Sequence, residues 1–161
     1  MKILSTILFL FFTTFIYGQS NHPRLTVIDF EHLINLNMEE RESYLDKYEF
    51  VYSGIVTVEA IKMHKYLYSD MRLQMGQSLV YYNDKEKKGI GYIFYDSEIY
   101  KNFKNSLLDN YEYLGDELSL ENGGLSYKNK MKNFFVTLKI EKVDTIDGSE
   151  DNMYIISFKN F

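Results

Sequence analysis

The 161-residue chain contains no cysteine, no tryptophan and a single proline. Without cysteine, no disulfide can stabilise the fold and no lipid can be attached to an N-terminal cysteine, so stability must come from the packed core. The chain also lacks an excess of basic residues, because 18 Lys and Arg stand against 23 Asp and Glu. The net charge of −5 argues against nucleic acid and anionic membrane surfaces as partners, since both select for basic patches.

An apolar run from Ile3 to Tyr17 follows Met1-Lys2 at the N-terminus. One basic residue, a short hydrophobic run and a small residue at Gly18 are typical of a secretory signal peptide. The run is shorter than the ~20 apolar residues that a membrane-spanning helix needs. We therefore expect residues 1–18 to be a cleaved signal peptide and the mature chain to be secreted or periplasmic, without a membrane span. A retained N-terminal anchor is the alternative.

Two stretches of the chain have helical periodicity. Residues 19–27 read as a disordered lead-in, and from Ile28 to Tyr48 apolar residues recur at steps of three and four. Asn37 followed by Glu40 has the pattern of a capping box, which predicts a break into two short helices. A later helix is predicted after an Asp-Ser cap, with one apolar stripe: Asp96, Ser97, Ile99, Phe103, Leu107, Tyr111 and Leu114.

Runs of β-branched and aromatic residues, separated by turns, predict antiparallel strands between and after these helices. An acidic segment at 144–152 reads as the hairpin between the last two strands, and 121–124 reads as a turn. Together these elements predict an α+β fold. The expected strands cover residues 55–59, 65–75, 78–82, 89–95, 125–129, 133–141 and 153–159.

The segments 44–54 and 107–117 are similar to each other at a shift of 63 residues. Each copy follows a predicted helix and leads into strands. This predicts one α+β domain over 28–161, built from two similar halves (28–95 and 96–161) with the helices on one face of a single sheet. Chance similarity of two tyrosine-rich helix ends is the alternative. The leucine pair (Leu45/Leu108) and the rings of the tyrosine pair (Tyr48/Tyr111) should be buried, and the aspartate pair (Asp46/Asp109) should be exposed. Glu49/Glu112 and the aromatic pair Phe50/Tyr113 complete the match, and the two aromatic residues should occupy equivalent places.

The order of these elements, a helix followed by antiparallel strands in tandem, resembles the beta-lactamase-inhibitor-protein family. The resemblance implies one long sheet whose exposed concave face grips a partner protein. That family's disulfides are absent here, so the resemblance assigns no site residue. The junction Gly18-Gln19 and the "YL…YEF" helix end also resemble small exported proteins of unknown function in Bacteroidota.

Motifs for catalysis or cofactor binding are not evident. The histidines His22, His32 and His64 have no helical i, i+4 spacing, and no cysteine can complete a zinc site. No nucleophile elbow or phosphate-binding loop occurs, and the "GIG" at 89–91 leads into a strand where a dinucleotide loop would need a helix. We therefore assign no catalytic residue, metal ligand or cofactor, although a Ser-His-Asp set could assemble from distant positions.

The acidic hairpin at 144–152 could offer oxygen ligands to calcium through Asp144, Asp147, Glu150 and Asp151. Its spacing does not match the calcium-binding loop of EF-hands. A polar turn at Asp147-Gly148 explains the same residues.

The strand at 133–141 alternates in a way that separates two faces. Phe135 falls on the solvent side, whereas Phe134, Val136, Leu138 and Ile140 should lie under the helices. We expect a non-catalytic binding module that recognises another protein or an envelope component with the open sheet face, with Phe135 as the candidate contact. The alternatives are an extracytoplasmic hydrolase whose site is not visible in the sequence, and an envelope-associated structural protein. The oligomeric state cannot be inferred.

Overall fold

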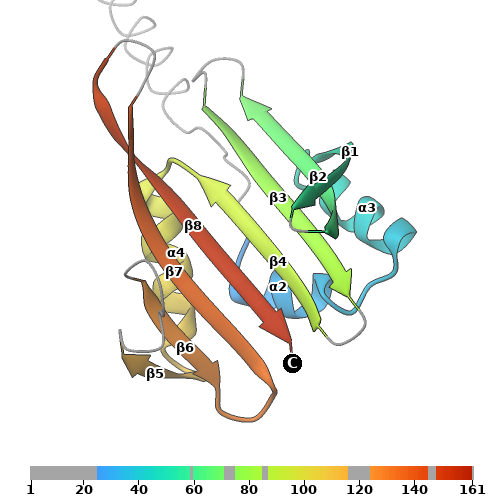
Figure 1. Ribbon diagram of the computed structural model, residues 1–161. Helices are drawn as coiled ribbons and strands as arrows, with labels where there is room; N and C mark the ends of the chain where they lie inside the picture. The colour runs from blue at the N-terminus through green and yellow to red at the C-terminus, as the bar shows by residue number, and fades with distance from the viewer. Residues whose placement is uncertain are drawn as a thin grey trace, which may run out of the picture.

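The computed structural model describes residues 25–58, 60–70, 75–84, 87–115, 124–144 and 148–160. Within these residues, three helices accompany one antiparallel sheet of eight strands, so the α+β class is confirmed (Figure 1). The elements are α2 (Val27–Leu33), α3 (Met38–Asp46), β1 (Val51–Val58), β2 (Ile61–Asp70), β3 (Met75–Asp84), β4 (Lys87–Phe94), α4 (Ser97–Leu107), β5 (Tyr111–Gly115), β6 (Leu125–Asn129), β7 (Phe134–Asp144) and β8 (Glu150–Asn160).

The strand order is β1-β2-β3-β4-β8-β7-β6-β5. The last strand of each half of the chain, β4 or β8, therefore lies at the centre of the sheet, and the first strand of each half lies at an edge. Tyr92 of β4 pairs with Ile156 of β8 in this central ladder. The β7–β8 pair confirms the predicted hairpin, although residues 145–147 at its tip lie outside the described residues.

The break between the first two helices occurs where the sequence predicts it. The side chain of Asn37 accepts a hydrogen bond from the Glu40 amide at 3.0 Å, and the Glu40 carboxylate accepts one from the Asn37 amide at 3.1 Å. This reciprocal cap satisfies two amides that the start of α3 would otherwise leave unpaired. The end of the expected disordered lead-in belongs to the folded domain, because α2 starts at Val27 and Leu25 is already buried. Residues 19–24 lie outside the described residues.

Aromatic rings from the helices and the central strands form the middle of the core. The ring of Phe30 in α2 lies 5.8 Å from Tyr92 of β4, 5.2 Å from Phe103 of α4 and 6.0 Å from Phe158 of β8. One side chain thus contacts another helix and both central strands. Such ring pairs stabilise a core beyond the area that they bury.

The second predicted helical stripe is correct only in its first part. Ile99, Phe103 and Leu107 are buried along α4, but the helix ends at Leu107. Tyr111 and Leu114 belong to β5, an edge strand that the sequence did not predict. The physical reason is that β5 pairs with β6, and these ladder hydrogen bonds override the continuing helical period.

The expected repeat at a shift of 63 residues is wrong in its register. Leu45 is fully buried, whereas Leu108 is 63 % exposed, because Leu107 occupies the buried place at the end of α4. Phe50 is buried and Tyr113 is half exposed, so these two residues are not equivalent either. The halves are also unequal, since the first contributes two helices and the second one. The sheet dominates, and a clean repeat of one helix and its strands is not present.

A different correspondence, at a shift of 61 residues, is visible in the two edge hairpins. Each first strand has a bulge that ends at a glycine with positive φ, Gly54 (109°) in β1 and Gly115 (87°) in β5. One residue before each bulge, a tyrosine ring packs at a tilt against a tyrosine ring of the next strand. The pairs are Tyr52–Tyr66 at 5.5 Å and Tyr113–Tyr127 at 5.4 Å.

The leucines at the helix ends give a direct stability test. We expect Leu45→Ala and Leu107→Ala each to lower the free energy of unfolding by about 2–5 kcal/mol, because both side chains are fully buried. Leu108→Ala, one residue along the chain, should change it by no more than about 0.5 kcal/mol. Urea unfolding of the three variants measures this. A large loss in Leu108→Ala would contradict the assigned end of α4.

Asp29 in the first turn of α2 is the acceptor of a local hydrogen-bond network. One of its carboxylate oxygens accepts from the Thr26 amide at 2.6 Å and the Thr26 hydroxyl at 2.7 Å. The other accepts from the hydroxyls of Tyr44 and Tyr48. Burial alone would raise the pKa of Asp29, but these hydrogen bonds favour the charged form and hold the pKa below its usual value of 3.8.

This lowered pKa predicts a pH dependence of stability. A carboxylate whose pKa is lower in the folded chain stabilises the fold above its unfolded pKa, and the contribution is lost as pH falls through the folded value. We expect the wild type to be more stable than Asp29→Asn near neutral pH, with the difference shrinking as pH falls below 3.8. Urea unfolding of both proteins across this range measures the difference. A difference that does not change with pH would contradict the role of the ionised carboxylate.

Candidate functional site

The sheet has two faces with different surroundings. Side chains from all three helices contact strand residues of one face: Phe30 packs on Tyr92, Arg41 lies over Tyr81 and Tyr100 stacks on Tyr154. In Figure 1, α2 and α4 lie behind the central strands, and the viewer looks at the opposite face. We call this opposite face, whose side chains alternate with the buried ones along each strand, the open face.

Side chains of the open face form rows across the strands, because the register pairs each residue with the next. One row is mostly apolar and a second is mostly small or polar. The first consists of Val51, Leu67, Ser78, Ile93, Ile155 and Lys139. The second consists of Lys65, Val80, Gly91, Ser157, Thr137 and Ser126, and a third of Met63, Tyr82, Gly89, Lys159, Phe135 and Lys128.

Two glycines of β4 keep the centre of the open face flat. A Cβ at Gly89 would lie 2.3 Å from the ring of Tyr82, and a Cβ at Gly91 would lie 2.9 Å from Val80. The side chains of β3 therefore lie across β4 instead of standing away from the sheet. At these two positions, β4 itself carries no side chain on the open face.

Phe135, the candidate contact residue, lies on the open face as the alternation in its strand predicts. Its side chain is partly exposed, and the Lys128 ammonium lies 5.4 Å from the centre of its ring. Phe134, Val136 and Leu138 are buried on the opposite face, as expected. Ile140 is wrongly predicted to lie under the helices, because β7 continues beyond the core and leaves this side chain exposed.

The histidines and the acidic hairpin do not converge on a metal site in the described part of the chain. His32 is exposed on α2 and contacts the ring of Tyr44, whereas His64 lies on β2, and His22 lies outside the described residues. In the hairpin, the Glu150 carboxylate accepts a hydrogen bond from Lys142 at 2.7 Å. Asp147 lies outside the described residues, so the calcium alternative rests on the sequence alone.

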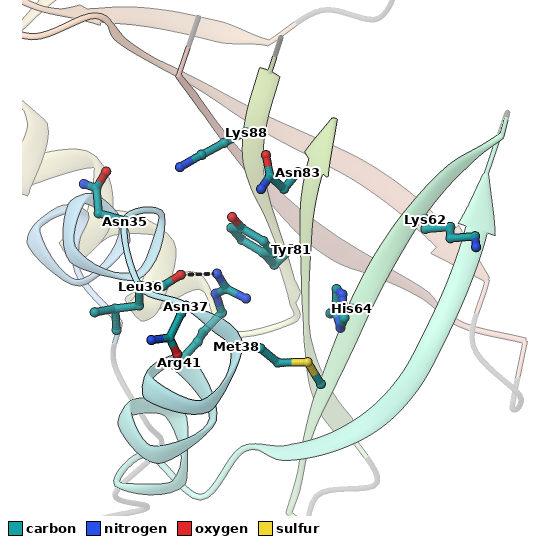
Figure 2. Close-up of a pocket in the computed structure, with 10 residues that line it drawn as sticks. All are labelled: Asn35, Leu36, Asn37, Met38, Arg41, Lys62, His64, Tyr81, Asn83 and Lys88. Carbon is teal, nitrogen blue, oxygen red and sulfur yellow. Dashed lines mark hydrogen bonds between the residues drawn. The ribbon is translucent and has the colours of Figure 1, made fainter. Parts of the chain in front are cut away.

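A pocket of about 520 Å³ lies on the helix side of the sheet, between the α2–α3 turn and strands β2, β3 and β4 (Figure 2). Its lining contains four side chains that are basic or can become so, and no carboxylate. We call it the basic pocket and define it by its ten lining residues. They are Asn35, Leu36, Asn37, Met38, Arg41, Lys62, His64, Tyr81, Asn83 and Lys88.

Arg41 forms the inner wall of the basic pocket and is only 3 % exposed. Its guanidinium donates hydrogen bonds to the carbonyl oxygens of Leu33, the last residue of α2, and of Leu36, in the turn that follows. The guanidinium carbon lies 3.3 Å from the centre of the Tyr81 ring, so the cation stacks on an aromatic face. Within the described residues, Arg41 forms no ion pair.

Two buried polar atoms near Arg41 have no hydrogen-bond partner within the described chain: the Nδ1 atom of His64 and the hydroxyl of Tyr66. Burial raises the pKa of the Tyr66 phenol, and the Arg41 guanidinium opposes that rise, through its close approach to the hydroxyl and through its charge. Unpartnered buried polar groups are uncommon, because each loses its hydrogen bonds to water without replacement. The region around the Arg41 guanidinium is therefore incompletely satisfied by the described residues alone.

Sequence reasoning missed the basic pocket, because its residues come from separate strands and from the turn between two helices. One signal was available. Arg41 follows Met38 by three positions and precedes Leu45 by four, so it falls on the apolar stripe of α3. A charged residue on a buried stripe must find partners, and that requirement points to a local polar site.

The geometry of Arg41 predicts that lysine cannot replace it. Arg41→Lys keeps the charge but loses the planar group that reaches two carbonyl oxygens and stacks on Tyr81. We expect the free energy of unfolding to fall by about 1.5–3 kcal/mol, the range for hydrogen bonds to charged groups. Urea unfolding at neutral pH measures the loss. A variant as stable as the wild type would show that the positive charge alone suffices.

Comparison of the chain with protein-family models, with curated proteins and with solved structures found no match. Among the described residues, no helix has the length and apolar character needed to cross a membrane.

Proposed function

We propose that this protein is an exported, non-catalytic binding module that docks a partner protein on the open face of its sheet. The observation that supports the proposal most strongly is the apolar row across β1, β2, β4 and β8. The row contains Val51, Leu67, Ile93 and Ile155. Each is next to another in the strand register, and Ser78 lies between Leu67 and Ile93. Isolated exposed apolar residues are common, but a contiguous patch marks an interaction site.

The shape of the open face favours a protein over a small molecule. Small ligands need concave sites that bury most of their surface. The centre of the open face is flat instead, because the Tyr82 ring and the Val80 side chain lie across Gly89 and Gly91. Lys159, Phe135 and Lys128 continue the row of Gly89 across β8, β7 and β6, and supply aromatic and charged contacts. An apolar centre with a polar surround is the usual composition of a protein interface.

Export is the second part of the proposal and rests on the sequence. Residues 1–18 have the composition of a signal peptide, and they lie outside the described residues. The absence of cysteine throughout the chain leaves a mature exported protein dependent on its core. The hydrolase alternative has no specific observation in its favour. The basic pocket contains His64, but its lining has no carboxylate to act with it.

We also propose that the two halves of the chain derive from one duplicated unit, in a register different from the sequence alignment at 63. Three features support this: the mirrored strand order, the tyrosine pairs of the edge hairpins and the bulges at Gly54 and Gly115. On this view, the bulge and the tyrosine pair belonged to the ancestral hairpin. The resemblance to the tandem plan of the beta-lactamase-inhibitor-protein family is part of this proposal.

Charge introduced into the apolar row tests the docking face. We expect the double substitution Ile93→Lys/Ile155→Lys to abolish capture of the partner from an extract of the native envelope. The wild type should retain it. Both side chains are only partly buried and face away from the core, so the variant should fold. Circular dichroism and thermal unfolding verify the fold, and mass spectrometry of the captured proteins identifies the partner.

The control places the same charge on a different surface. Ile28 is 72 % exposed on α2, and Ile28→Lys should capture the partner as the wild type does. Capture that is equal for the wild type, the control and the double variant would contradict docking on the open face. Loss in Ile28→Lys alone would place the interaction on the helices.

A further inference from the structure

We propose that the basic pocket binds a small organic anion through its carboxylate or phosphate group. This inference concerns the helix side of the sheet and is independent of the docking proposed for the open face. The pocket is the place where α3 and strands β2 and β4 bring Arg41, Lys62 and Lys88 to one cavity.

Charge is the first argument. The chain as a whole is acidic, with a net charge of −5, yet the pocket lining contains three cationic side chains and no Asp or Glu. Arg41, Lys62 and Lys88 form no ion pair within the described residues. A concave, partly desolvated site lined by charge of one sign concentrates counter-ions of the opposite sign. An anion is therefore the complementary ligand.

The fixed position of Arg41 is the second argument. A guanidinium has five N–H donors, and the two carbonyl oxygens of Leu33 and Leu36 do not use all of them. Stacking on Tyr81 holds the group in place, so little side-chain entropy is lost when it contacts a ligand. In Figure 2, Arg41 lies at the inner end of the pocket beside the Leu36 carbonyl. Its planar array of donors suits the oxygens of a carboxylate or phosphate.

The mouth of the pocket supplies mobile cations and amides. Figure 2 shows Lys88 and Lys62 on opposite sides of Tyr81, on strands β4 and β2, with the Lys62 ammonium directed away from the Tyr81 ring. Lysine side chains are long and flexible, so either ammonium can move toward an anion between them. Asn83 lies beside Lys88, and its amide makes no hydrogen bond within the described residues.

The size of the pocket selects the kind of anion. A cavity of about 520 Å³ is far larger than one phosphate ion and falls in the range of small-molecule sites. The Tyr81 ring and the side chains of Leu36 and Met38 provide apolar contacts beside the charges. We therefore infer a ligand with an organic body and a charged oxyanion group. The shared chemistry is the oxyanion, which a carboxylic acid or a phosphate ester could each supply.

Isothermal titration calorimetry with citrate and with glucose 6-phosphate tests the inference and distinguishes the two sources. Both titrations are run at constant ionic strength, balanced with sodium chloride, on the purified wild-type protein. We expect saturable binding of at least one probe. Binding of citrate alone assigns the site to carboxylates, and binding of glucose 6-phosphate alone assigns it to phosphate esters.

Paired variants then locate the site. Lys62→Gln/Lys88→Gln should weaken binding at least about tenfold, the order of a lost hydrogen bond to a charged group. Lys101→Gln/Lys130→Gln removes the same charge from exposed positions on α4 and between β6 and β7, and should leave the affinity within about twofold. Thermal unfolding verifies that both variants fold. No saturable binding of either probe, or equal weakening in the two double variants, would overturn the proposal. Loss of partner capture in Ile93→Lys/Ile155→Lys is measured separately, so the two proposals can fail independently.

Discussion

The pairing of β4 with β8 is the interaction on which the rest of this fold depends. It joins the strands of the two halves into one sheet, and no disulfide can assist it because the chain has no cysteine. Phe30 spans this junction on the helix side, where its ring contacts Tyr92 of β4 and Phe158 of β8. The open face extends across this junction, because its rows run from β4 into β8. Loss of the junction would divide that face, whereas the basic pocket is lined by residues of the first half alone.

Local signals in the sequence predicted the elements better than their ends. The cap at Asn37 and the stripe through Ile99 and Phe103 depend on residues three or four positions apart, and both are correct. The error at the end of α4 has a non-local cause. Tyr111 and Leu114 continue the helical period, but β6 offers Tyr111 a strand partner that periodicity cannot reveal. The same limit explains why the alignment at a shift of 63 residues pairs the buried Leu45 with the exposed Leu108.

The two candidate surfaces differ in how far the sequence could have revealed them. Alternation in β7 was enough to place Phe135 on the open face, because side chains in a strand point to opposite sides in turn. The basic pocket depends on long-range register, which pairs His64 with Tyr81 and Asn83 with Lys88. No property of one segment foretells that these residues share a cavity with α3. Composition was misleading here, since an acidic chain gave no indication of a basic site.

The bulges at Gly54 and Gly115 have a consequence for the behaviour of the protein in solution. They lie in β1 and β5, the two edge strands, whose outer backbone groups face away from the sheet. An unbroken edge can pair with the edge of another molecule and extend the sheet from chain to chain. A bulge interrupts the regular ladder and increases the local twist, so a second strand cannot pair along the full length. A tyrosine-rich sheet without disulfides thus carries an obstacle to polymerisation at each of its ends.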